Sequence, residues 1–122
     1  MTDIINIKSL TSAPNFEGKV ALVTGGGKGL GRACTIGLAA AGAKVIAIAR
    51  TESDLKEVKA HNPEKITYWT EDVLDDRLYS KIEDLNQLDI LVGCAGANKP
   101  QPISDITLET IDWLMDLNVR AI

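Results

Sequence analysis

The sequence predicts an α/β fold in which a parallel sheet carries helices on both faces. Three observations predict it: short apolar runs recur along the chain, segments of helical periodicity separate them, and glycines follow the first run. Strands that alternate with helices at this spacing form a parallel sheet, because each crossover helix returns the chain to the same end. With right-handed crossovers, four such strands take the order 3-2-1-4.

The first strand is predicted at residues 20–23, a short run with valine at both ends that suits burial on both faces. Glycines then dominate residues 25–29, and helical spacing extends to Gly42, which stands at the usual C-terminal cap position. One stripe of this helix carries mostly small residues, which we expect to lie against the sheet: Leu30, Ala33, Cys34, Leu38 and Ala41.

The same alternation continues to the end of the chain. Further strands are predicted at residues 44–49, 66–69 and 89–93, and further helices at about 51–60, at 75–85 and from 107 onward. The last helix is still apolar at Ile122, and no glycine, proline or basic residue caps it. We therefore expect residues 18–122 to be the N-terminal part of a domain truncated within a helix, and residues 1–17 to be an extension of little structure.

Composition excludes several classes of protein. With 122 residues, 45% apolar and 25% charged, the chain is one ordinary globular domain or part of one. Its net charge of −4 argues against nucleic-acid binding, and no apolar run approaches the roughly 18 residues of a membrane span. Cys34 and Cys94 are expected to be free thiols in a cytoplasmic protein, and no cysteine or histidine spacing predicts a metal site.

The glycine-rich turn predicts a phosphate site. It has the spacing Gly25-x-x-x-Gly29-x-Gly31 after Thr24, which matches neither Gly-x-Gly-x-x-Gly nor the mononucleotide-binding loop. A strand that enters a helix through glycines directs backbone N–H groups and the positive helix end at one spot. A turn without a ligand is the alternative, which the flanking strand and helix disfavour. The candidate residues here are Gly25, Gly27, Lys28, Gly29, Leu30 and Gly31.

The end of the second strand favours NADP(H) over NAD(H). An NAD site usually places an acid about 20 residues after the turn, to accept from the ribose hydroxyls. Residues 47–51 contain no acid, and Glu52 already belongs to the next helix. Arg50, with Thr51 beside it, is instead placed to meet a 2′-phosphate, and Lys28 adds a second positive charge. The alternative is that both cations are solvated surface residues.

Two further segments are candidates for cofactor contacts, since ligands of such sheets bind beyond the carboxyl ends of the strands at the switch between strands 1 and 4. Asp72 follows the third strand and can accept from an adenine amino group, with Val73 beside the ring; a helix cap is the alternative. Cys94, Ala95 and Gly96 follow the fourth strand and allow a close backbone approach, unless they form only a tight loop.

Together these motifs resemble those of the short-chain dehydrogenases/reductases, over roughly residues 18–122. The glycine turn is similar to the cofactor turn of that family, and Asp72 matches its adenine-binding Asp. Asn118, within Leu-Asn-Val-Arg, matches the structural and catalytic Asn of the family. Gly-Lys-Gly in the turn and Ala-Arg-Thr after the second strand look closest to the dicarbonyl/L-xylulose reductases and tetrameric carbonyl reductases. The resemblance implies a Rossmann-type, doubly wound fold, here incomplete.

Two departures from the family pattern bear on activity. The family usually has Asn-Asn-Ala-Gly after strand 4, where this chain has Gly-Cys-Ala-Gly at residues 93–96. The catalytic Ser and the Tyr-x-x-x-Lys motif of the family are missing from the 122 residues. Neither tyrosine begins such a motif, because the fourth residue after Tyr68 is Asp72 and the fourth after Tyr79 is Glu83. In the family the tyrosine donates the proton to the carbonyl and the lysine lowers its pKa.

The leading hypothesis is therefore the NADP(H)-binding part of an NADPH-dependent carbonyl reductase. The resemblance implies a small dicarbonyl or a ketose such as L-xylulose as substrate, and a homotetramer for the full-length protein. The alternative is a catalytically inactive nucleotide-binding protein that acts through a partner. An S-adenosylmethionine-dependent methyltransferase shares the glycine turn, but it usually has an acid at the end of strand 2, where Ala49 and Arg50 stand here.

Overall fold

The computed structural model describes residues 15–97 and 99–121, so most of the expected extension at residues 1–17 lies outside the described residues. Its elements in chain order are β1 (Val20–Thr24), α2 (Gly29–Ala40), β2 (Lys44–Ala49), α3 (Glu52–Ala60), β3 (Ile66–Thr70), α4 (Asp76–Glu83), β4 (Ile90–Gly93), a 3-10 turn η1 (Ile103–Asp105), α5 (Leu108–Met115) and a π-helical turn η2 (Asp116–Arg120). The first described residues contact the body, because the Phe16 N–H donates to the Ala41 carbonyl at 2.8 Å.

The four strands form one parallel sheet in the order β3-β2-β1-β4, which confirms the predicted fold class and strand order. In the register, Leu22 of β1 lies between Ile46 of β2 and Leu91 of β4. Because the strands are parallel, their carboxyl ends share one edge of the sheet. The glycine turn, the end of β2 and the loop after β4 therefore meet at that edge.

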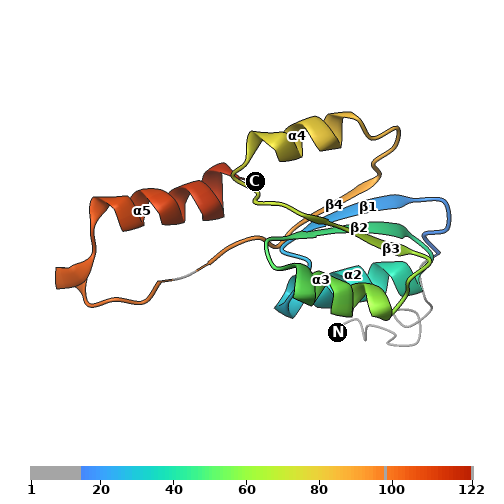
Figure 1. Cartoon of the computed structure of the whole chain (residues 1–122), viewed down its shortest axis with the longest axis horizontal. Helices are drawn as coiled ribbons and strands as arrows, with labels where there is room; N and C mark the ends of the chain where they lie inside the picture. Colours follow the sequence, from blue (N-terminus) through green and yellow to red (C-terminus); the bar gives the residue numbers. More distant parts are fainter. Residues whose placement is uncertain (1–14, 98, 122) are drawn as a thin grey trace, which may run out of the picture.

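Helices cover the two faces of the sheet, with α2 and α3 on one side and α4 on the other (Figure 1). The α2–α3 side buries Ala21, Val23, Ala39, Ala43, Val45, Val58 and Ile66. The other side buries Leu22, Ile46, Ile48, Val73, Leu78 and Leu117. Successive residues of β1 thus belong to opposite cores, which is why this strand has a continuous apolar run rather than an alternating one.

Helix α2 contacts the sheet through a stripe that matches the predicted one only in part. Leu30 is 81% exposed and Ala33 is exposed as well, while Cys34 and Leu38 are only partly buried. The buried residues of the helix are Gly31, Thr35 and Ala39. Gly31 approaches the turn too closely for any side chain, and the Thr35 hydroxyl donates to the Gly31 carbonyl at 2.9 Å. The expected stripe is therefore corrected in part. Cys34 and Leu38 pack against the core as predicted, whereas Leu30 and Ala33 are exposed.

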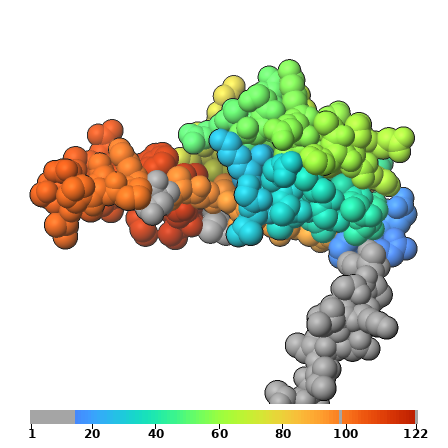
Figure 2. Space-filling view, turned by 90° about the horizontal axis from the view of Figure 1, so that it is seen from below, coloured from blue at the N-terminus to red at the C-terminus, as the bar shows by residue number. Residues whose placement is uncertain are grey.

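The C-terminal segment projects from the sheet domain. Figure 2 shows the residues around α5 extending beyond the body formed by the strands and by α2 and α3. Thr107 caps α5 by accepting from the Thr110 N–H at 3.2 Å, and η2 then buries Leu117 against the sheet. No helix within the described ranges has the length and apolar character that crossing a bilayer requires.

Candidate functional site

A pocket of about 270 Å³ lies at the carboxyl edge of the sheet. It brings together ten of the residues predicted to bind a cofactor: Gly25, Gly27, Lys28, Arg50, Thr51, Asp72, Val73, Cys94, Ala95 and Gly96. These residues come from four separate segments of the chain, each directly after one of the strands. The pocket is thus a product of the parallel topology and not of any single motif.

The glycine turn forms the innermost wall of the pocket because its backbone packs directly on the loop after β4. Gly25 has a positive φ of 65°, and a Cβ there would lie 2.7 Å from the Ala95 nitrogen. A Cβ on Gly31 would lie only 1.9 Å from the Gly25 carbonyl oxygen. Two glycines are therefore required sterically, one to turn the chain and one to let α2 begin against it.

Gly29, Leu30 and Gly31 form the first turn of α2 and do not line the pocket itself. Lys28 is the N-cap residue, and its side chain makes no capping hydrogen bond. The first N–H groups of a helix have no intrahelical acceptor, so this end retains donors and the positive end of the helix dipole. Such an end suits an anionic group of a ligand.

The end of β2 contributes the positive charge. Arg50 is exposed at the pocket, and no ion pair involves it among residues 15–97 and 99–121. Thr51 beside it is the N-cap residue of α3 and makes no side-chain capping bond, so its hydroxyl is not used by the helix. Lys28 also lines the pocket, but its Nζ lies 3.3 Å from Oδ2 of Asp54, so its charge is paired.

Three carboxylates also line the pocket, and each has a partner. Asp54 pairs with Lys28 as described, and Glu71 pairs with Lys81 at 2.6 Å. Asp72 uses Oδ1 to accept from the Leu74 N–H at 3.0 Å, while Asp75 and not Asp72 caps α4. The ion pairs neutralise two of the acids, whereas Arg50 and Asp72 take part in no ion pair among the described residues.

Asn118 lies outside the pocket lining and braces the loop behind it. Its Nδ2 donates to the carbonyls of Ala97 (3.0 Å) and Leu114 (2.9 Å), and its Oδ1 accepts from the Ala97 N–H at 3.1 Å. A Cβ on Gly96 would lie 2.7 Å from the same Oδ1, so Gly96 permits this close approach. Every hydrogen-bonding group of the amide is thus engaged with backbone.

Cys94, at the position where the resemblance leads us to expect an asparagine, is partly buried between the pocket and α2. Burial raises the pKa of the Cys94 thiol, and the neighbouring Cys34 thiol raises it further. The thiol is therefore protonated near neutral pH. Within the described ranges, no cluster of His, Cys, Asp and Glu side chains could hold a metal ion.

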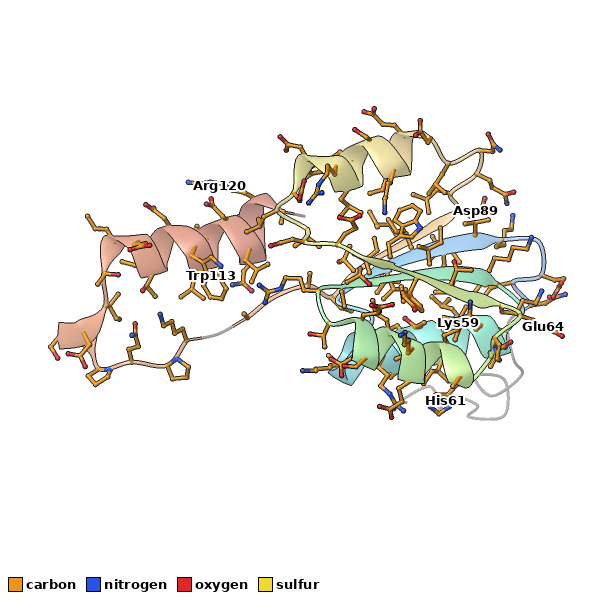
Figure 3. The ribbon with its side chains drawn as sticks, in the orientation of Figure 1. Lys59, His61, Glu64, Asp89, Trp113 and Arg120 are labelled. Carbon is orange, nitrogen blue, oxygen red and sulfur yellow. The ribbon has the colours of Figure 1, made fainter. Side chains whose placement is uncertain are left out.

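Two carboxylates with a lowered pKa do not line the pocket. Hydrogen bonds from the Val20 N–H and from Gln87 lower the pKa of Asp89, which stands at the opposite end of the strands (Figure 3). Asp75 has a lowered pKa because the Arg77 side chain and N–H donate to it. Both groups serve local structure at strand and helix starts.

The sequence reasoning missed five of the pocket residues, which are Ile48, Ala49, Asp54, Glu71 and Leu117. Asp54 stands in the first turn of α3, four residues after Arg50. Because α3 starts at the edge of the sheet, its first turn lies close to the glycine turn. A Cβ on Gly27 would lie 3.2 Å from the Asp54 Cβ, which shows how closely the two segments pack. The position of Asp54 in the first turn of the predicted helix was the signal in the sequence that could have identified it as a pocket residue.

Comparison with known proteins agrees with this geometry. The family model described as short chain dehydrogenase matches residues 19–122. The chain is 34% identical over 107 residues to an L-xylulose reductase of Mesocricetus auratus, and 36% identical over 109 residues to a D-erythrulose reductase of Gallus gallus. Each match covers 88% of this chain and 44% of the relative, so the chain spans less than half the length of these relatives.

A solved structure extends the comparison to the fold. A crystal structure of a short chain dehydrogenase from Bacillus anthracis is 26% identical, with a TM-score of 0.74, over 84% of this chain and 45% of that one. Three findings lead to the same family: the order of the strands, the glycine turn at the carboxyl edge, and the match of the family model to residues 19–122. The chain belongs to the short-chain dehydrogenase/reductase family of oxidoreductases.

Proposed function

We propose that this chain binds NADP(H) and forms the cofactor-binding part of a carbonyl reductase. One observation carries the cofactor preference: Arg50 makes no ion pair within the described part of the chain and stands at a glycine-lined pocket, directly after a strand end that has no acid. The family implies a nicotinamide cofactor. A guanidinium at this place favours the form with a 2′-phosphate, because it can bind phosphate oxygens through two parallel hydrogen bonds.

The pocket fits part of such a cofactor. Gly25 and Gly27 line the pocket without side chains, so the turn offers bare backbone where phosphates must approach closely. A volume of about 270 Å³ lies just below the range of roughly 300–1,000 Å³ for small-molecule sites, so the pocket suits only part of a dinucleotide. Arg50 and Thr51 would hold the 2′-phosphate, and Asp72 and Val73 would hold the adenine.

The substrate proposal rests on the relatives. Two of them are named as reductases of L-xylulose and D-erythrulose, which are ketoses. We propose that the whole protein reduces a small dicarbonyl or a ketose such as L-xylulose, and that it forms a homotetramer as the resemblance implies. The nicotinamide supplies the hydride when bound, and this chain's residues orient it. Asn118 would support catalysis by holding the loop at the pocket in place.

The cofactor proposal is tested by titrating the chain with NADPH and NADH, with binding followed by calorimetry. Arg50→Asp should weaken NADPH binding about ten- to a hundredfold, the loss expected for a charge-assisted contact, and should leave NADH binding nearly unchanged. Lys44→Asp is the matched control, since it removes an exposed cation at the other end of the same strand. An equal loss for both cofactors in Arg50→Asp contradicts the role of Arg50.

A second candidate is a nucleotide-binding protein without catalysis, and the placement of the tyrosines favours it for the isolated chain. Tyr68 donates to Glu52 at 3.2 Å and Tyr79 is 47% exposed on α4, and neither lines the pocket. The purified chain is then expected to bind NADPH without oxidising it when L-xylulose is added. Turnover measured by loss of NADPH absorbance would reject this candidate.

A further inference from the structure

The ion pair between Lys28 and Asp54 stands inside the pocket proposed for the 2′-phosphate. The two charged atoms are 3.3 Å apart, and both residues line the same pocket as Arg50. Lys28 comes from the glycine turn and Asp54 from the first turn of α3. The pair therefore connects the two segments that would have to accommodate a phosphate.

The two partners differ in how firmly they are held. The Asp54 side chain is only 25% exposed, and its Cβ lies so close to Gly27 that a Cβ added there would be 3.2 Å from it. The Lys28 side chain is 79% exposed, so its ammonium can move to another anion without disturbing the core. The carboxylate is in effect fixed, and the cation is the partner that can be exchanged.

A bound 2′-phosphate would set two anions against one ammonium. A phosphate monoester carries a charge of about −1.5 to −2 near pH 7, and it would sit beside Arg50 within reach of the same lysine. To engage Lys28 it would have to displace the Asp54 carboxylate, and that carboxylate would remain close by as a like charge. NAD(H), which has a hydroxyl in place of the phosphate, meets no such competition.

We infer that Asp54 is a specificity-determining residue that competes with the 2′-phosphate for Lys28 and so lowers the preference for NADP(H) over NAD(H). The inference rests on the proposed function, since it assigns the role of one more residue in the same site. It predicts that the wild-type chain binds NADPH more weakly than a variant in which Asp54 has lost its charge and Arg50 and Lys28 are unchanged.

The test uses two nucleotide fragments that differ only in the presence of the 2′-phosphate. The chain is titrated calorimetrically with 2′,5′-ADP and with 5′-AMP, as wild type and as Asp54→Asn, which keeps the size of the side chain. Asp54→Asn should tighten 2′,5′-ADP binding about two- to fivefold, the range expected for one partly exposed charge pair, and leave 5′-AMP binding unchanged. Glu57→Gln is the matched control. Glu57 is on α3 like Asp54 and pairs with Arg32 of α2, but it does not line the pocket.

A second variant separates competition from simple repulsion. In a Lys28→Met background, Asp54→Asn should improve 2′,5′-ADP binding less than it does in the wild type, because the cation under competition is gone and only the like-charge repulsion remains. The inference is overturned if Asp54→Asn leaves the affinity for 2′,5′-ADP unchanged or weakens it, or if the full gain persists without Lys28. If the wild-type chain binds neither fragment nor NADPH, the proposed function fails and the inference fails with it. Normal binding with no response to Asp54→Asn removes the inference alone.

Discussion

Two glycines of α2 make opposite predictions for the same substitution. At Gly31 an added Cβ would lie 1.9 Å from the Gly25 carbonyl oxygen, which belongs to backbone and cannot move aside cheaply. Gly31→Ala should lower the free energy of unfolding by about 1–3 kcal/mol, the usual cost of overpacking, and should also weaken nucleotide binding. Urea unfolding measures the first effect and calorimetric titration with NADPH measures the second.

Gly37 is the control for that experiment. It is exposed on the same helix, and a Cβ there meets nothing within 4 Å. Gly37→Ala should raise the free energy of unfolding by up to about 1 kcal/mol, because alanine loses less backbone entropy in a helix than glycine. Equal effects at the two positions would show that α2 does not pack against the turn as described.

The Cys94 thiol should react slowly with alkylating agents at neutral pH. Burial and the neighbouring Cys34 raise its pKa, so the reactive thiolate forms only at more alkaline pH than for a free cysteine. Mass spectrometry of the Cys94 peptide after timed iodoacetamide treatment should show a rate that still rises where glutathione has levelled off. Cys34→Ala removes one of the two causes and should shift the profile part of the way back. A wild-type profile identical to that of glutathione contradicts the buried placement.

Among the elements, strands are the part of this fold that sequence patterns predict well. A strand buried on both faces needs an unbroken apolar run, and the predicted runs at residues 20–23, 44–49 and 66–69 lie within or match β1, β2 and β3. Their order follows from crossover handedness, which is nearly invariant. The carboxyl edge, and with it the neighbourhood of Arg50 and the glycine turn, follows from that order.

The exposure of Leu30 on α2 and the inclusion of Asp54 in the pocket could not be predicted in the same way. Apolar periodicity assigns Leu30 to the buried stripe, yet steric fit places Gly31 and Thr35 there, because only a glycine fits against Gly25 and the threonine hydroxyl bonds within the helix. Asp54 lines the pocket because the first turn of α3 lies next to the glycine turn. Both outcomes depend on backbone approach distances, which periodicity does not encode.

The junction between η2 and the loop after β4 should depend on Asn118. Asn118→Ala removes three hydrogen bonds and leaves the Ala97 N–H and carbonyl without their partner, which should cost about 1–3 kcal/mol locally. Hydrogen exchange should become faster in residues 94–97 and 114–121. Arg120→Gln on the surface of η2 (Figure 3) removes only an exposed ion pair with Asp116 and should change exchange little. Unchanged exchange in Asn118→Ala would show that the amide is not the brace.

At the scale of the whole molecule, two apolar surfaces remain uncovered within the described residues. One is the free edge of the sheet at β4, where Leu91 is 65% exposed. The other is on the projecting C-terminal segment, where Leu108 is 80% exposed and Ile111, Met115 and Val119 are about half exposed. An exposed strand edge with an apolar side chain is a template for pairing with another chain.

The purified chain is therefore expected to self-associate, and the two surfaces can be told apart by matched lysine substitutions. Leu91→Lys places a charge on the strand edge, which opposes edge-to-edge pairing, whereas Leu108→Lys places the same charge on α5. Light scattering over a range of concentrations should show association of the wild type. If the edge of β4 makes the contact, Leu91→Lys lowers the average mass toward 13.1 kDa and Leu108→Lys does not. The reverse pattern would assign the contact to α5, and a wild type that stays monomeric at every concentration would show that neither surface drives association.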